Sequence, residues 1–429
     1  MVNQFNISDL TFDQDFKELL TKNRDTENDV SGVVKDILKD VRLNGDLAVL
    51  AYTKKFDRIE LTAKSIRVSA QEIKDAVNKC DKETIDALNI AANRIRNFHI
   101  RHLPEDDNMI DAEGVELSVR WNAVSAAGIY VPGGKAVYPS SVLMNAIPAK
   151  AAGVERIIMV VPAPEGYLNP LVLAAAHIVG INEIYKIGGA QAIGALAYGT
   201  ETIKQVDVIA GPGNSFVAAA KKEVFGTVGI DMIAGPSEIL VVSDNKNDPA
   251  WIAIDLLSQA EHDEVAQSIL ITDDEGYAAK VIDAVDEHLK TLPRADIART
   301  SWQNHGCVIV VDSMDQVPTL VDQIAPEHLE LALDNANEFS KKIRNAGSIF
   351  VGRHTPEAIG DYIAGPNHVL PTSGSARFSS GLSVLNFMKR STVIECTKES
   401  LEILGPPAMK LATEEGLDAH KYSIGIRLE

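Results

Sequence analysis

Gln259 and His262 lie three residues apart in the segment Asp-Leu-Leu-Ser-Gln-Ala-Glu-His at 255–262. If this segment is helical, the two side chains lie on one face of the helix, about one turn apart. An amide oxygen and an imidazole nitrogen on a shared face can both coordinate a divalent metal ion. The pair is therefore interpreted as half of a metal site.

Acidic and imidazole side chains come together again in three later segments, APEHLEL, GDYIAGPNHVLPT and EEGLDAH. The residues concerned are Glu327, His328, Asp361, His368, Glu415 and His420. One bound ion needs several such ligands, and a dehydrogenation or hydrolysis also needs a general base. These segments therefore supply the further metal ligands and the general base that a site built on Gln259 and His262 would need.

Each of these residues also has a structural alternative. Glu327 could complement the dipole in the first turn of a helix that begins after a proline. Asp361 could be a turn residue or the first residue of a helix, and Glu415 could form an acidic surface pair with Glu414. These alternatives stay open at the level of the residues alone.

The other histidines are assigned to structure, including a pair that imitates the proposed metal site. His99 and His102 have the same spacing as Gln259 and His262, but Arg96 and Arg101 lie beside them, and positive charge opposes cation binding. The remaining histidines assigned to structure are His177, His288, His305 and His354.

Composition restricts the class of protein that carries these residues. The chain has 429 residues, of which 45% are hydrophobic and 5% aromatic, so we expect roughly two to four globular domains. A formal net charge of −19 opposes binding to nucleic acid and to anionic lipid. Neither a membrane-spanning stretch nor a signal peptide is evident, and the three cysteines form no CxxC pair, so we expect a cytoplasmic protein without disulfides.

The hydrophobic period changes near residue 125. Before it, apolar residues recur at three and four positions, which is typical of amphipathic helices; after it, short apolar runs alternate with alanine-rich helical stretches. This alternation predicts an α/β fold with two incomplete Rossmann-like parallel-sheet domains. The predicted division is a helical arm at 1–25, a first α/β domain at 26–128 plus 239–380, a second at 129–238, and a helical tail at 381–429.

Three glycine-rich turns follow predicted strands in the second α/β domain. They are GIYVPGG at 128–134, IGGAQAIGALAYG at 187–199 and IAGPGNSF at 209–216. Each leads towards a helix whose N-terminus would attract an anion, so together they indicate a nucleotide cleft, with Tyr130, Gln191 and Asn214 as candidate contacts. None has the GxGxxG fingerprint, and each turn alone could be a plain strand-to-helix connection.

Several motifs, taken in order, resemble histidinol dehydrogenase. They are IDMIAGPSEILVV at 230–242, DLLSQAEHD at 255–263, APEHLEL at 325–331, AGPNHVLPT at 364–372 and LDAH at 417–420, together with GIYVPGG and GGAQAIGALAYG. The resemblance runs from about residue 120 to the end, and the helical first part is compatible with it in length. One departure is Ser243, where the family usually has a small apolar residue.

The resemblance implies a role for each candidate residue. The zinc ligands fall on Gln259, His262, Asp361 and His420, the acid–base pair on Glu327 and His328, and the NAD contacts on Tyr130, Gln191 and Asn214. Substrate contacts fall on Ser237, His368 and Glu415, together with His328 and the zinc ligands. In this family the C-terminal ligand comes from the second subunit of a homodimer, so the tail with Glu415 and His420 is expected to cross over.

The implied reaction is an NAD-dependent, four-electron oxidation of L-histidinol through L-histidinaldehyde to L-histidine, the last steps of histidine biosynthesis. His328 would take the hydroxyl proton, and Glu327 would activate the water that adds to the aldehyde. Zinc would orient the substrate. Two alternatives are a related zinc and NAD dehydrogenase acting on another amino alcohol or polyol, and a zinc-dependent hydrolase that needs no NAD.

Overall fold

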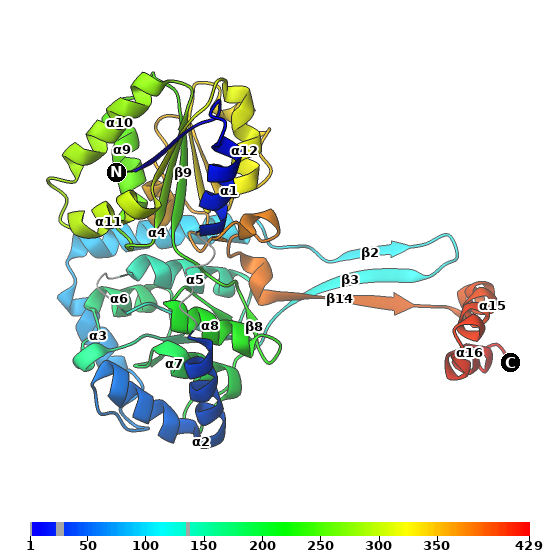
Figure 1. Ribbon diagram of the computed structural model, residues 1–429. Helices are drawn as coiled ribbons and strands as arrows, with labels where there is room; N and C mark the ends of the chain where they lie inside the picture. Colours follow the sequence, from blue (N-terminus) through cyan, green and yellow to red (C-terminus); the bar gives the residue numbers. More distant parts are fainter. Residues whose placement is uncertain (1, 23–29, 134–137) are drawn as a thin grey trace.

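The computed structural model describes residues 2–22, 30–133 and 138–429 and has an α/β architecture (Figure 1). Two parallel sheets form the body, and a small antiparallel sheet carries the C-terminal helices away from it. Within the described ranges, helices long and apolar enough to cross a bilayer are absent. The predicted α/β class with two parallel sheets is confirmed.

The larger parallel sheet has six strands. In spatial order they are β1 (Asn3–Asn6), β11 (Cys307–Val310), β10 (Gln267–Thr272), β9 (Glu238–Ser243), β12 (His328–Ala332) and β13 (Ser348–Val351). The edge strand β1 comes from the range predicted as a purely helical arm, and it pairs in parallel with β11. The N-terminal residues therefore contribute a strand to this sheet before helix α1 (Phe12–Lys22) begins.

Both faces of this sheet are buried, because side chains on each strand alternate between two cores. In β9, Leu240 and Val242 belong to one core and Ile239 and Val241 to the other. The first core lies beneath α1, α12 (Val317–Ile324) and α13 (Ala336–Ser340). The second lies beneath α9 (Pro249–Ala260), α10 (Glu275–His288) and α11 (Ala295–His305).

The smaller parallel sheet has five strands. In spatial order they are β6 (Glu183–Tyr185), β5 (Arg156–Val160), β4 (Ala126–Tyr130), β7 (Val208–Ala210) and β8 (Gly229–Ile230). The helices that pack around it are α2 (Ser31–Asp57), α3 (Ala70–Lys79), α4 (Lys82–Ile100), α5 (Pro139–Ala151), α6 (Pro170–Ile178), α7 (Gly189–Tyr198) and α8 (Ser215–Val224).

Helices α2, α3 and α4 pack on the five-stranded sheet, whereas the sequence division grouped residues 26–128 with residues 239–380. Val34 and Leu38 of α2 share a core with Leu196 of α7, and Ile95 of α4 shares a core with Leu143 of α5. The apolar faces of the N-terminal helices were therefore recognised, but not the sheet that they cover. The remaining domain boundaries stay predictions.

An arm projects from the body and ends in two helices (Figure 1). It contains β2 (Asp107–Ile110), β3 (Glu116–Ala123) and β14 (Met388–Glu395), followed by α15 (Lys398–Glu414) and α16 (Asp418–Gly425). The tail is helical in α15 and α16, as predicted from residues 401–422, but β14 was not predicted; it pairs antiparallel with the full length of β3. This strand is almost entirely exposed, so its sequence has no apolar alternation that would reveal it.

His99 is buried in α4 and lies far in sequence from the metal-site motifs. Only 1% of its surface is exposed, and both ring nitrogens lack a hydrogen-bond partner among the described residues. Burial, with a smaller contribution from the nearby His102, lowers the pKa of His99 from 6.5 to about 4. The neutral ring fits the structural role expected from the sequence.

Acidification is therefore expected to destabilise the fold through His99. Below pH 6.5 the unfolded chain protonates this histidine, while the folded chain does so only near pH 4, so stability falls as the pH drops through this window. The change corresponds to on the order of 3 kcal/mol of unfolding free energy. The free energy of unfolding, measured with denaturant above pH 6.5 and near pH 4, should differ less between the two pH values for His99→Leu than for the wild type. The exposed His177→Leu in α6 is the control and should keep the wild-type difference.

Candidate active site and metal centre

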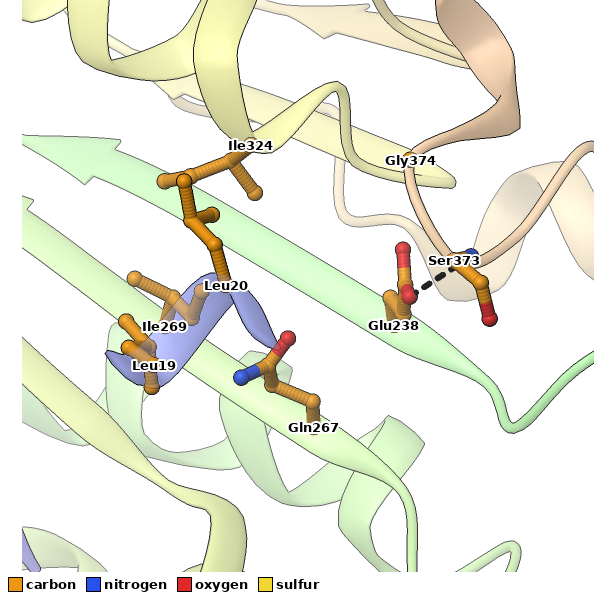
Figure 2. A pocket seen from close by; sticks show the side chains of 8 residues that line it. All are labelled: Leu19, Leu20, Glu238, Gln267, Ile269, Ile324, Ser373 and Gly374. Carbon is orange, nitrogen blue, oxygen red and sulfur yellow. Dashed lines mark hydrogen bonds between the residues drawn. The ribbon is translucent and has the colours of Figure 1, made fainter. Parts of the chain in front are cut away.

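Glu238, Glu327 and His328 meet where β9 and β12 begin side by side. The backbone N–H of Glu238 donates to Glu327 Oε2 at 2.9 Å, and His328 Nδ1 lies 2.9 Å from the Glu238 carbonyl oxygen. The Glu238 side chain accepts in turn from the backbone N–H of Ser373 at 2.8 Å (Figure 2). The alternative that Glu327 starts a helix is wrong, because His328 is the first residue of a strand.

These contacts determine which nitrogen of His328 can act as a base. A carbonyl oxygen only accepts hydrogen bonds, so Nδ1 carries the proton and Nε2 presents its lone pair. Burial lowers the pKa of His328 from 6.5, although Glu357 and the Glu238 carbonyl oppose this effect. Burial also raises the pKa of Glu327 well above 4.5. The pair is thus a neutral imidazole beside a carboxyl group of increased basicity.

His328 Nε2 points towards two further carboxyl groups that could hold a metal ion. It lies 3.5 Å from Glu357 Oε1 and 3.9 Å from Asp361 Oδ1, and ligand atoms of the three residues all lie within 4.8 Å of one another. Asp361 lies in the short helix α14 (Ala358–Tyr362). Burial and the neighbouring Glu357 raise the pKa of Asp361 well above its usual value. A bound cation would relieve this crowding of negative charge.

Gln259 and His262 lie at the end of α9, beside this cluster. Helix α9 ends at Ala260, but the His262 N–H still donates to the Gln259 carbonyl oxygen at 3.0 Å, so the helical turn expected between them is present. Gln259 is 1% exposed, and neither amide atom has a partner among the described residues. An unpaired buried amide is costly, which fits a ligand that binds there.

His262 and His368 complete the group of imidazoles in the site. Burial lowers the pKa of both, that of His368 to about 4. The ring of His368 is held by the Asp361 carbonyl oxygen, 3.0 Å from Nδ1. Neutral imidazoles can bind a metal ion or accept a hydrogen bond, so both residues suit the roles that the sequence predicts.

Glu357 was not predicted from the sequence, although its carboxyl group lies within the charged cluster. It is 1% exposed, Ser258 Oγ donates to its Oε2 at 3.2 Å, and its Oε1 has no partner within the described ranges. Its charge adds to the effect of burial in raising the pKa of Glu327 and Asp361, and it opposes the lowering of the pKa of His262 and His368 by burial. The available signal was its position four residues before Asp361, the spacing that places two side chains on one helical face.

The structure of the single chain does not bring every predicted residue to this site. Ser237 directly precedes Glu238 and is half-buried, and its contact with substrate stays a prediction. Glu415, which directly follows α15, and His420 in α16 are exposed, and these two helices lie at the far end of the arm (Figure 1). Within one chain these two residues are therefore separate from Gln259 and Asp361.

The predicted cofactor residues lie at the carboxyl edge of the five-stranded sheet. Tyr130 ends β4, Gln191 lies in the first turn of α7, and Asn214 caps α8 by accepting from the Val217 N–H at 3.2 Å. The Gly189 N–H donates to the Tyr130 hydroxyl at 3.1 Å, while burial raises the pKa of Tyr130 to about 12. Gly134 of the first turn lies outside the described residues.

Two observations support cofactor binding at these turns. Gln191 Oε1 is buried without a partner among the described residues. A Cβ on Gly188 would lie 2.5 Å from Pro162, and a Cβ on Gly211 would lie 2.1 Å from the Tyr130 carbonyl oxygen. Glycine is therefore required for the strand ends to approach each other this closely. Such backbone turns before helix N-termini suit a pyrophosphate.

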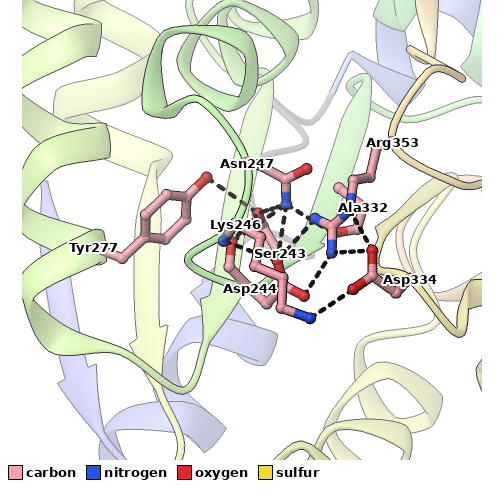
Figure 3. A network of polar contacts seen from close by, with 8 residues as sticks. All are labelled: Ser243, Asp244, Lys246, Asn247, Tyr277, Ala332, Asp334 and Arg353. Atoms are coloured by element: carbon pink, nitrogen blue, oxygen red, sulfur yellow. Dashed lines mark hydrogen bonds and ion pairs between the residues drawn. The ribbon is translucent and has the colours of Figure 1, made fainter.

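Ser243 lies at the opposite end of β9 from the candidate site. Asn247 Nδ2 donates to Ser243 Oγ and to the Ala332 carbonyl oxygen, each at 2.8 Å, and the Tyr277 hydroxyl lies 3.2 Å from Ser243 Oγ (Figure 3). The neighbouring Arg353 forms a bidentate ion pair with Asp244. The buried hydroxyl is thus satisfied within a local network and leaves the site chemistry unchanged.

Comparisons with known proteins agree with this geometry. The family model described as "Histidinol dehydrogenase" matches residues 20–428. The histidinol dehydrogenase of Rhodospirillum rubrum is 58% identical over 414 residues, covering 96% of this chain and 95% of the relative, and that of Brucella suis is 56% identical with both chains covered completely. The crystal structure of histidinol dehydrogenase from Elizabethkingia anophelis has a TM-score of 0.94 at 40% identity and covers 100% of this chain and 98% of that one. The chain therefore belongs to the histidinol dehydrogenase family.

Proposed function

We propose that this enzyme oxidises L-histidinol through L-histidinaldehyde to L-histidine, with NAD as the acceptor in both steps. The observation that carries this proposal is the position of His328 Nε2, which has no hydrogen-bond partner among the described residues and lies close to the carboxyl groups of Glu357 and Asp361. Membership of the family supports the substrate and the reaction. The cofactor turns support a dinucleotide bound at the carboxyl edge of the five-stranded sheet.

Gln259, His262 and Asp361 would hold a zinc ion together with His420 of the partner subunit. The donor set of amide oxygen, imidazole and carboxylate is one that zinc accepts. When bound, the zinc orients the amino and imidazole groups of the substrate, and the nicotinamide accepts a hydride in each oxidation. His328 could also be a ligand with Glu357 and Asp361, but its fixed tautomer favours the role of a base.

In the first oxidation, His328 Nε2 removes the proton of the substrate hydroxyl while a hydride leaves the same carbon. The C–H bond breaks more easily as the oxygen gains negative charge. Glu327 then removes a proton from a water molecule whose oxygen adds to the aldehyde carbonyl, and protonated His328 gives its proton to the carbonyl oxygen, which forms the hydrate and regenerates the base. His328 removes a hydroxyl proton from this hydrate as the second hydride leaves, and the resulting carboxylic acid loses its remaining proton to give the carboxylate.

An assay of purified enzyme with histidinol and NAD, followed through the absorbance of the reduced cofactor, tests the function. We expect two equivalents of reduced NAD for each histidine formed, since the oxidation removes four electrons. The competing zinc-dependent hydrolase would turn over its substrate without NAD. Oxidation of another amino alcohol or polyol in preference to histidinol would identify the related dehydrogenase instead.

We also propose that two chains share their active sites through the projecting arm. Its helices and the turn between them expose large apolar side chains, among them Leu411, Leu417 and Tyr422, which an isolated chain would leave in water. Glu415 lies in the same turn, and His420 lies in α16. Docking of this surface on a second copy would cover the apolar residues and deliver His420 of the partner subunit to the metal site.

Complementation between two inactive variants tests the shared site. Co-expressed His262→Ala and His420→Ala chains should regain about a quarter of wild-type activity, because half of the dimers are mixed and each mixed dimer has one intact site. Co-expression of His262→Ala chains with Gln259→Ala chains is the matched control. It should stay inactive, since both ligands of each site come from the same chain. Failure of the first pair to regain activity, although mixed dimers form, would contradict the shared site.

A further inference from the structure

Lys221 and Asp231 form a buried ion pair beneath the third glycine-rich turn. The Lys221 side chain is 2% exposed and the Asp231 side chain 0%. Lys221 lies in α8, whereas Asp231 follows β8 and starts the segment that crosses to β9. Removing both charges from water is costly, and good geometry with additional hydrogen bonds is needed to offset that cost. The partners of these two groups therefore indicate what the pair does.

The pair binds both backbone polar groups of Gly211. Lys221 Nζ donates to the Gly211 carbonyl oxygen at 2.9 Å, and the Gly211 N–H donates to Asp231 Oδ2 at 2.8 Å. The remaining carboxylate oxygen of Asp231 accepts from the Met232 N–H at 2.6 Å. Gly211 has a φ of +116°, which residues with a side chain rarely adopt. Its peptide groups are thus held in a conformation that the turn could not keep as readily without the pair.

Gly211 belongs to the third glycine-rich turn and lies close to Tyr130 of the first one. A Cβ at this position would collide with the carbonyl oxygen of Tyr130, so glycine lets the two segments approach closely, and Gly211 is three residues before Asn214, the cap of α8. From Asp231 the chain continues to Ser237 and Glu238 in the active site. The ion pair therefore connects the cofactor turn to the segment that leads to Ser237 and Glu238 in the active site.

We propose that Lys221 and Asp231 are positioning residues for NAD, which clamp Gly211 so that Tyr130 and Asn214 keep the spacing that the dinucleotide requires. This inference rests on the proposed function. A buried ion pair that only stabilised the fold could be replaced by neutral residues without any effect on cofactor affinity. A clamp predicts weaker NAD binding even where the fold is retained.

Calorimetric titration of NAD into the zinc-loaded enzyme tests the clamp, using the neutral double variant Lys221→Met/Asp231→Asn. We expect the NAD dissociation constant to rise about tenfold to a hundredfold, as for other misplaced contacts, while the KM for histidinol changes less than about twofold. Lys221→Arg keeps the positive charge and a hydrogen-bond donor, so it should bind NAD more tightly than the neutral double variant does.

The matched control is Arg156→Met/Glu183→Gln, a half-buried pair where β5 and β6 begin, at the opposite edge of the same sheet. It should lower stability but leave NAD affinity unchanged. The proposal would be contradicted if the folded double variant bound NAD within about twofold of the wild-type affinity. It would also be contradicted if the control variant lost as much NAD affinity as the double variant. If the double variant does not fold, the NAD affinity of the single variant Asp231→Asn is measured instead, and the same twofold limit applies. Wild-type enzyme that does not bind NAD would instead contradict the proposed function.

Discussion

Glu327→Gln is expected to slow the oxidation of histidinaldehyde by about 10²–10⁴-fold, the usual contribution of one general base. Oxidation of histidinol should be affected much less, because that step needs no water. Glutamine keeps the size of the side chain, and its amide oxygen can still accept from the Glu238 N–H that now binds Glu327 Oε2. The variant therefore removes the base with little change in geometry.

Separate rate measurements with histidinol and histidinaldehyde distinguish the two half-reactions. Equal losses with both substrates would contradict the division of labour between Glu327 and His328. Glu330→Gln is not a suitable control, because this residue is buried beside Glu357 and bonds to its backbone N–H. The exposed Glu338→Gln in α13 is a suitable control and should leave both rates unchanged.

His328→Asn is expected to slow both half-reactions by about 10²–10⁴-fold, because each oxidation needs a proton removed from oxygen as hydride leaves. The asparagine amide can still donate to the Glu238 carbonyl oxygen that now binds His328 Nδ1, but it offers no lone pair in place of Nε2. Rates with both substrates and the zinc content should be measured together. We expect zinc to be retained, since His328 is assigned as a base.

The outcome for His328→Asn also separates a base from a ligand. Loss of zinc in parallel with activity would place His328 among the ligands with Glu357 and Asp361. A loss confined to one substrate would contradict a base that acts in both oxidations. His177→Asn, the same exchange at an exposed position in α6, should have no effect on either rate or on zinc.

The sequence was informative wherever a local pattern reflects burial. The central strands of both parallel sheets are continuous apolar runs because they are covered on two faces, and the turns after β4, β6 and β7 contain the glycines that close packing requires. Gln259 and His262 were found because one helical turn spaces them, and Glu327 with His328 because an acid and an imidazole stand side by side in the chain.

What the sequence left open depends on contacts between distant segments. Glu357 precedes a helix of only five residues, so no extended period identified it, and its place beside His328 comes from the pairing of β12 with β9 and β13. The exposed β14 was missed for lack of a buried face. The cytoplasmic location and the crossing of the tail into a second subunit stay predictions.

Zinc analysis of the purified enzyme, with activity measured before and after chelation, tests the central claim most directly. If Gln259, His262 and Asp361 with His420 of the partner subunit hold one ion beside His328, each chain should contain one zinc. Chelation should then abolish histidinol oxidation, and added zinc should restore it. Full turnover of histidinol by enzyme shown to be free of metal would contradict the account.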